Sequence, residues 1–314
     1  MEPAPFIIPL QAIHDGITNE YGINLFMLRT DLNHTYISGN KLFKLKYNLL
    51  EAKKKDCKTI LTFGGAFSNH IAATAAAGKE YGFSTIGIIR GEASAELNPT
   101  LEFAVACGMQ LQYVSRTLYR NKEELYNYIN QQFPEKNIYI IPEGGSNELG
   151  IMGCQEITQH ITTDFNYVCC PCGTGVTMSG IILSLKEKQQ SIGFQILKAD
   201  GYIKNEVSNW LQTASQNNTI IKSEIPDKTF SNNWSINEDY HFGGYARVKS
   251  DLTAFIKKFK NSHNIELDYI YTGKMMFGIY DLIKKNHFKR GETILAIHTG
   301  GLQGNAGMES FKKI

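Results

Sequence analysis

The stretch KTILTFGGAFSNHIAATAAAGKEY, residues 58–81, decides the fold class. Its first part, 58–63, is apolar and β-branched and predicts a buried strand, which two glycines then stop. Ser68 and Asn69 are residue types that begin helices, and an alanine-rich helix is predicted over 69–81. A strand that passes through a glycine turn into a helix is one βα unit of a parallel sheet.

The same alternation extends along most of the chain and predicts parallel sheets covered by helices on both faces. A length of 314 residues suits two domains. We expect two three-layer α/β domains with mostly parallel sheets, a large one of residues 1–43 and 145–314 and a small one of residues 44–144. Residues 215–245 are poorly patterned and predict a surface excursion. Further strands are predicted at 84–91, 109–114, 137–145, 166–173, 194–201 and 293–301, and further helices at 44–55, 98–108, 150–161, 177–188, 251–263 and 275–288.

Composition narrows the class of protein. Apolar residues make up 42% and charged residues 20%, as in ordinary globular proteins. The net charge of +2 gives no broad basic field, so we expect no nucleic-acid partner. No apolar run approaches a membrane span and no signal peptide opens the chain, so we expect a cytoplasmic protein with no membrane partner. The six cysteines are not spaced as a disulfide framework, and reduced thiols are expected.

Four predicted strands end in glycine-bearing turns, and CGTGVTMSG is the one most typical of an anion site. Gly173, Thr174, Gly175, Val176 and Thr177 lie between a strand and an apolar helix, where backbone amides and hydroxyls can surround a phosphate. The spacing matches neither the dinucleotide fingerprint nor the P-loop, so nucleotide binding is the second interpretation. Taken alone, a glycine-rich segment at a strand end is often only a turn.

Other motifs are more typical of buried or helix-capping side chains than of metal or catalytic sites. Cys169 and Cys172 form a C-x-x-C inside a predicted strand, but no second pair completes a zinc site, so buried thiols are expected and no metal. Ser68 and His70 lack the glycine of a nucleophile elbow, so an acyl-transfer triad fits poorly. Ser68 can equally be a plain helix cap, and His298, like His70, is expected to pack.

The stretch SGNKLFKLKYNLLEAKKK, residues 38–55, contains many lysines, most of which predict a solvated helical face. Lys41 differs because it follows Gly39 and Asn40 at the predicted helix start. A turn there can direct its amine into a cleft, as a nucleophilic lysine requires.

Together these segments resemble the fold-type II pyridoxal-phosphate enzymes, and within them the family of 1-aminocyclopropane-1-carboxylate (ACC) deaminase and D-cysteine desulfhydrase. The resemblance spans nearly the whole chain and is carried by the spacing of its motifs. These are LRTDL, GNKLFKL around Lys41, GGAFSNH, CGTGVT, LDYIYTGKMMFGI and ILAIHTGG. The family fold implies pyridoxal 5'-phosphate in a cleft between the two domains, a small amino-acid substrate and a homodimer.

The resemblance also implies a role for each matching residue. Lys41 holds the cofactor as a Schiff base and is a candidate for proton transfer. Ser68 receives the substrate carboxylate or acts as an acid or base, with Asn69 and His70 contributing backbone amides. Tyr271 and, as a second candidate, Tyr245 of HFGGYAR act at the substrate. For the cofactor, Asn69 binds the phenolic oxygen, Thr299 the ring nitrogen, and Gly173, Thr174, Gly175, Val176 and Thr177 the phosphate.

Two positions bear on the reaction. Ring-opening members resemble one another in having Glu after the tyrosine and Leu in place of the HTGG threonine, whereas this chain has Thr272 and Thr299. Both are similar to the D-cysteine desulfhydrase side, which implies β-elimination to pyruvate, ammonia and hydrogen sulfide, with Thr272 at the substrate. ACC deamination is the alternative. D-Serine or another β-substituted amino acid stays open as substrate, and a non-catalytic protein that binds pyridoxal phosphate is a more distant hypothesis.

Overall fold

The computed structural model describes residues 7–134, 137–217 and 233–306. Contacts divide the chain into two compact units, which we call unit 1 (residues 1–44 and 148–302) and unit 2 (residues 45–147 and 303–314). The chain first passes from unit 1 to unit 2 inside helix α2, Asn40–Lys54. The expected limits of the small domain, 44 and 144, lie within three residues of the crossing points at 45 and 147. Of the C-terminal residues, the described 303–306 group with unit 2.

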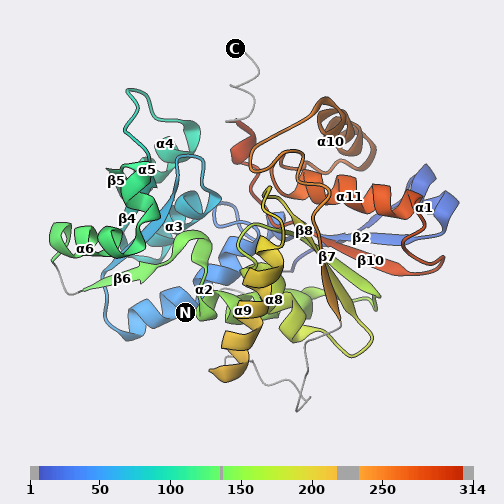
Figure 1. Cartoon of the computed structure of the whole chain (residues 1–314), viewed down its shortest axis with the longest axis horizontal. Helices are drawn as coiled ribbons and strands as arrows, with labels where there is room; N and C mark the ends of the chain where they lie inside the picture. The colour runs from blue at the N-terminus through green and yellow to red at the C-terminus, as the bar shows by residue number, and fades with distance from the viewer. Residues whose placement is uncertain (1–6, 135–136, 218–232, 307–314) are drawn as a thin grey trace. The chain divides into compact units, whose positions relative to one another are not determined.

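Unit 2 is a parallel sheet between two helical layers (Figure 1). Its strand order is β5-β4-β3-β6, and every pair is parallel. Neighbouring residues of β4 face opposite layers: Ile88 packs with Leu125 of α6, and Ile89 packs with Ile71 of α3. The elements are β3 Thr59–Gly65, β4 Ser84–Arg90, β5 Met109–Val114, β6 Ile138–Ile141, α3 Asn69–Tyr81, α4 Pro99–Ala106, α5 Arg116–Arg120 and α6 Lys122–Gln132.

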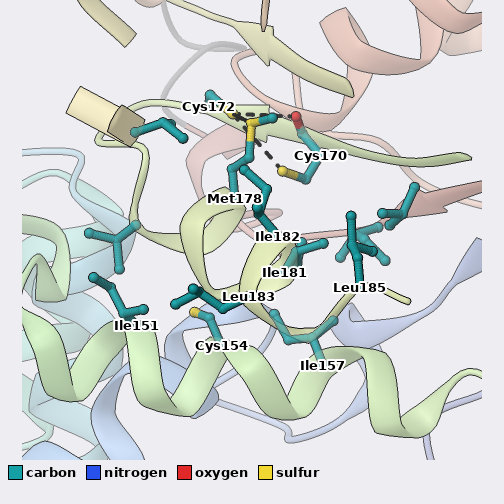
Figure 2. Close-up of a cluster of buried hydrophobic side chains, with 14 of the residues drawn as sticks. Ile151, Cys154, Ile157, Cys170, Cys172, Met178, Ile181, Ile182, Leu183 and Leu185 are labelled. Atoms are coloured by element: carbon teal, nitrogen blue, oxygen red, sulfur yellow. Dashed lines mark hydrogen bonds between the residues drawn. The ribbon is translucent and has the colours of Figure 1, made fainter. Parts of the chain in front are cut away.

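Unit 1 is built on a six-stranded sheet in the order β1-β2-β10-β7-β8-β9, in which only the β1–β2 pair is antiparallel. Helices α7, α8 and α9 pack on one face, where their apolar residues join those of β7 in one core cluster (Figure 2). Helix α11 contacts β7, α1 and α10. The elements are β1 Leu10–Ile13, α1 Gly16–Tyr21, β2 Asn24–Leu28, α7 Glu148–Gln155, β7 Tyr167–Cys172, α8 Val176–Ser184, β8 Gln190–Gln195, α9 Tyr202–Gln216, β9 Trp234–Asn237, α10 Ser250–His263, α11 Thr272–Lys284 and β10 Thr293–Ile297.

The expected α/β class with mostly parallel sheets is confirmed, and several elements begin and end where local signals place them. Helix α3 covers 69–81 and β5 covers 109–114, as predicted. Asn98 caps α4 with Pro99 in its first turn, and Gly82 ends α3 with a φ of 77°.

Other expectations were wrong or incomplete. The strand predicted at 194–201 lies earlier, as β8 at 190–195. The prediction missed its first residues because polar side chains such as Ser191, which do not look like part of a buried strand, are buried within it. Of the expected surface excursion, 218–232 lies outside the described residues, and 234–237 forms edge strand β9 beside β8. Within the described part of the chain, no helix is long and apolar enough to cross a membrane.

Candidate active site

Lys41 lies at the beginning of α2, and backbone contacts fasten this helix start to the end of β10 in unit 1. The amide of Asn40 donates to the carbonyl of Thr299 over 3.3 Å, and that of Gly39 donates to the carbonyl of Thr30 over 2.9 Å. Gly39 has a φ of 74°, and a Cβ built on it would lie 2.0 Å from the Thr299 carbonyl oxygen. Only glycine fits such an approach, so the turn before Lys41 is held against Thr299.

The predicted phosphate nest joins the same helix start. The Asn40 side-chain amide donates to the Thr177 hydroxyl over 2.8 Å. Gly175, with a φ of 78°, precedes α8 and offers no side chain to cap it, which leaves the first-turn amides without a side-chain cap. The indole of Trp210 donates to the Thr174 carbonyl over 3.2 Å and fixes the loop from the other side. A helix beginning of this kind favours an anion.

A second lysine of the same helix, Lys44, is buried beside the nest, with 2% of its surface exposed. Burial lowers the pKa of Lys44, and the thiols of Cys154 and Cys172 oppose that shift. Burial raises the pKa of Cys154 to about 11, although Lys44, a hydrogen bond with Thr177 and Lys41 pull it down. Lys41, Lys44 and Thr177 therefore all surround Cys154.

The expectation of a solvated lysine face was wrong for Lys44. Its burial had a signal in the sequence, because it lies between Phe43 and Leu45, which are also buried, and three residues after Lys41. A single lysine between apolar residues of a helix also fits a position at the edge of the solvent-exposed face, so the pattern alone does not predict burial.

A buried ion pair lies beside the end of β10, where Oδ1 of Asp31 is 3.7 Å from Nδ1 of His298. The guanidinium of Arg29 donates to both carboxylate oxygens of Asp31, with distances of 2.9 and 2.7 Å. His298 lies 2.7 Å from the Glu266 carbonyl through Nε2, and its Nδ1 accepts from the amide of Gly300 over 3.3 Å. His298 is thus packed, as expected, and fixes the turn that follows Thr299.

Two predicted tyrosines meet near the nest. A Cβ on Gly173 would lie 3.4 Å from Cε1 and 3.7 Å from the hydroxyl oxygen of Tyr271, so this ring lies over the first nest glycine. The rings of Tyr245 and Tyr271 pack edge to face, with centroids 6.2 Å apart. Tyr245 is 42% exposed. Thr272 is fully buried, and its hydroxyl has no hydrogen-bond partner among the described residues.

The predicted residues of unit 2 are engaged inside that unit. The Ser68 hydroxyl accepts from the amides of His70 and Ile71 over 3.2 and 3.3 Å and caps α3. The side-chain oxygen of Asn69 accepts from Gln303 over 2.9 Å. His70 is 2% exposed, and its Nε2 lies 2.8 Å from the Thr62 hydroxyl, which donates to the carbonyl of residue 141. The capping interpretation of Ser68 is confirmed, whereas its role toward substrate stays a prediction.

Several sulfur groups of unit 1 pack together in one core cluster. Cys170 and Cys172 project to the same side of β7, with their Sγ atoms 4.0 Å apart, and Cys172 lies 3.5 Å from Met178 (Figure 2). Cys169 and Cys172 are both free and buried. Burial raises the pKa of Cys169 well above its usual value. Throughout residues 7–134, 137–217 and 233–306, no group of histidine, cysteine or acidic side chains is arranged to hold a metal ion.

Comparisons with known proteins lead to one family. The profile of the family described as "Pyridoxal-phosphate dependent enzyme" matches residues 7–300. A Pyrococcus horikoshii protein, named provisionally as an ACC deaminase, is 28% identical over 318 residues, which cover 97% of this chain and 92% of that protein. An Arabidopsis thaliana protein, named as a mitochondrial bifunctional D-cysteine desulfhydrase and ACC deaminase, is 29% identical over 313 residues, covering 92% of this chain and 74% of that protein.

One solved structure resembles the whole chain. It is described as an ACC deaminase homologue, has a TM-score of 0.81 at 27% identity, and the match covers 100% of this chain and 95% of that one. The matched region therefore includes the nest, the helix start at Lys41 and the end of β10.

Proposed function

Because the chain belongs to the pyridoxal-phosphate dependent enzymes, whose profile matches residues 7–300, we propose that it eliminates the β-substituent of a small D-amino acid, with D-cysteine as substrate. The chain is an enzyme, pyridoxal phosphate is its cofactor, and similar proteins have the names of deaminases and of a desulfhydrase. In the proposed reaction D-cysteine and water give pyruvate, ammonia and hydrogen sulfide. The thiol leaves the β-carbon with the electron pair of its bond to carbon.

The observation that carries the proposal is the cluster of Lys41, Thr177 and Thr299 in unit 1, which fits this cofactor. The uncapped beginning of α8 and the Thr177 hydroxyl suit a phosphate dianion. Lys41 provides the amine that would hold the cofactor covalently. The bound cofactor supplies an electron sink for the bond broken at the substrate's α-carbon.

Thr299 supports elimination over reactions that need a long-lived carbanion. We assign its hydroxyl to the ring nitrogen of the cofactor. A neutral hydroxyl stabilises a protonated ring nitrogen less than a carboxylate would, so negative charge is better passed to a leaving group than stored. The 3.3 Å bond from the amide of Asn40 to the Thr299 carbonyl helps to keep this residue in place.

The remaining assignments concern the substrate. The hydroxyls of Tyr271 and Tyr245 are the groups that would hold or move a proton at the leaving sulfur. We assign Ser68, Asn69 and His70 to the substrate carboxylate. The Ser68 hydroxyl caps α3 by accepting from the amides of His70 and Ile71. To bind the substrate carboxylate it would have to donate its own proton while keeping these bonds, or give them up to the substrate.

The choice of D-cysteine rests on Thr272, which stands where ring-opening members of the family resemble one another in having Glu. Thr272 is fully buried, and its hydroxyl has no partner in the described parts of the chain, so a carboxylate in its place would need a new partner. ACC deamination is the second candidate, and the names of the similar proteins favour it. D-Serine and other β-substituted amino acids share the leaving-group chemistry of D-cysteine.

The test is a product assay with purified holoenzyme. Sulfide is measured from D-cysteine and from L-cysteine, pyruvate from D-serine, and 2-oxobutyrate from ACC. We expect sulfide from D-cysteine, and product from ACC alone would overturn the substrate assignment. Lys41→Ala should remove the visible absorption of the bound cofactor together with activity, whereas Lys53→Ala, at an exposed lysine of the same helix, should change neither.

A further inference from the structure

The beginning of α11, which carries Tyr271, is held by a buried carboxylate. Asp268 is 2% exposed and accepts three successive amides, from Ile270 over 2.9 Å, from Tyr271 over 2.6 Å and from Thr272 over 2.8 Å. Tyr271 itself has no capping side chain. The backbone direction at Tyr271, and with it the position of its ring, therefore depends on Asp268.

The loop that carries Tyr245 is held by a buried lysine of the same helix. Lys274 is 1% exposed, and its ammonium donates to the carbonyls of His241 over 2.9 Å and Gly244 over 2.8 Å. The Gly244 amide also donates back to the His241 carbonyl over 3.0 Å, which closes a tight turn. Gly243 and Gly244 have φ values of 100° and 117°, so this turn uses backbone conformations that other residues rarely adopt.

Burying the charged Lys274 ammonium to bind two carbonyls costs free energy of folding. Burial lowers the pKa of Lys274 to about 8, with Asp268 opposing the shift, so the protein stabilises the charged form less well than water does. A neutral donor could bind the same carbonyls without that cost. A buried group that lowers the stability of the fold while fixing a local conformation is typical of a functional site, where the geometry matters more than stability.

We propose that Asp268 and Lys274 are positioning residues, which hold Tyr271 and Tyr245 in the edge-to-face pair required for substrate turnover. Asp268 acts through the backbone of Tyr271, and Lys274 acts through the turn before Tyr245. The two tyrosines are 26 positions apart in the sequence, and one helix beginning fixes both. This inference rests on the proposed role of the tyrosines at the substrate.

The first measurement does not depend on turnover. In Lys274→Met, which keeps the length and removes the donor, hydrogen exchange of peptides covering 239–247 should accelerate at least about fivefold, while peptides covering 293–299 stay unchanged. Lys284→Met, at an exposed lysine of the same helix, is the matched control and should leave both unchanged. Equal exchange in Lys274→Met and the control would overturn the positioning role.

The second measurement separates positioning from general loss of structure. In Lys274→Met, kcat should fall at least about tenfold with KM changed less than about threefold, and the absorption of the bound cofactor should stay as in the parent enzyme. The melting temperature should fall by no more than about 4 °C, because the loss of two hydrogen bonds is offset by removal of a costly buried charge. Loss of cofactor or a large fall in melting temperature would show a structural role instead.

A double-mutant cycle then tests the route of action. If Lys274 acts through Tyr245, then Lys274→Met combined with Tyr245→Phe should be no slower than the slower single variant. Additive losses would contradict that route. If Tyr271→Phe and Tyr245→Phe both turn over at the parent rate, the proposed role of the tyrosines fails, whatever Lys274→Met shows in hydrogen exchange.

Discussion

The candidate site residues of units 1 and 2 are held in place by different kinds of contact. In unit 1, Lys41, Thr177 and Thr299 come from three distant parts of the chain, and bonds made by Asn40 join them. In unit 2, the helix start at Ser68 is satisfied by its own hydroxyl, and His70 turns to the interior. A site assembled from distant segments needs close backbone packing, whereas a capped helix beginning forms locally. We therefore expect changes in unit 1 to affect the fold and cofactor together, and changes in unit 2 to separate stability from activity.

The largest effect is expected at Gly39. In Gly39→Ala the new methyl group would meet the Thr299 carbonyl at a φ of 74°, which should cost about 3 kcal/mol or more of stability and displace Lys41. Urea denaturation and cofactor absorbance measure the two effects.

Gly82 of unit 2 gives a matched control for that substitution. It has a similar φ of 77° but open space around its Cβ position, so Gly82→Ala should cost about 1 kcal/mol and leave cofactor binding intact. Equal losses in the two variants would show that the approach of Gly39 to Thr299 does not matter.

A smaller effect is expected at Thr272. A glutamate in this fully buried position should lower turnover of D-cysteine by about tenfold, because its carboxylate must be accommodated beside Tyr271. Thr272→Val removes only the hydroxyl and should keep or slightly raise the melting temperature, since that hydroxyl is unpartnered among the described residues. An unchanged turnover rate in Thr272→Glu would remove this residue from substrate choice.

A modest, local effect on stability is expected at Ser68. Ser68→Ala should cost about 1 kcal/mol through loss of the α3 cap. Ser68→Asn keeps a capping oxygen, as Asn98 does for α4, but lacks the hydroxyl. If Ser68 also acts on substrate, Ser68→Asn should keep the melting temperature of the parent and lose most of its turnover. Parent-like turnover would leave Ser68 as a cap alone.

The sequence predicted best what is encoded locally. The helix over 69–81 follows from Ser68 at its start and Gly82 at its end, and the nest at 173–177 follows from a strand, glycines and an apolar helix. These signals lie within one turn of the feature that they predict. The same locality explains why the α/β class was predictable from the alternation of strands and helices.

The sequence failed where long-range contacts decide the outcome. Lys44 is one of several lysines in residues 38–55, and the fold places it near Cys154. Lys274 lies in the same motif as Tyr271, but the carbonyls that it binds, at His241 and Gly244, are 33 and 30 residues away. Strand β9 is four residues long and, within the described residues, pairs along β8 alone, so its own sequence gives little signal.

The central claim is that the cofactor is held in unit 1 by Lys41. The most direct measurement is borohydride reduction of the holoenzyme followed by peptide mapping by mass spectrometry, which locates the lysine joined to the cofactor. We predict a single modified site at Lys41, with Lys44 and Lys46 unmodified. Modification at Lys44, at a lysine outside α2 or at no lysine would contradict the account.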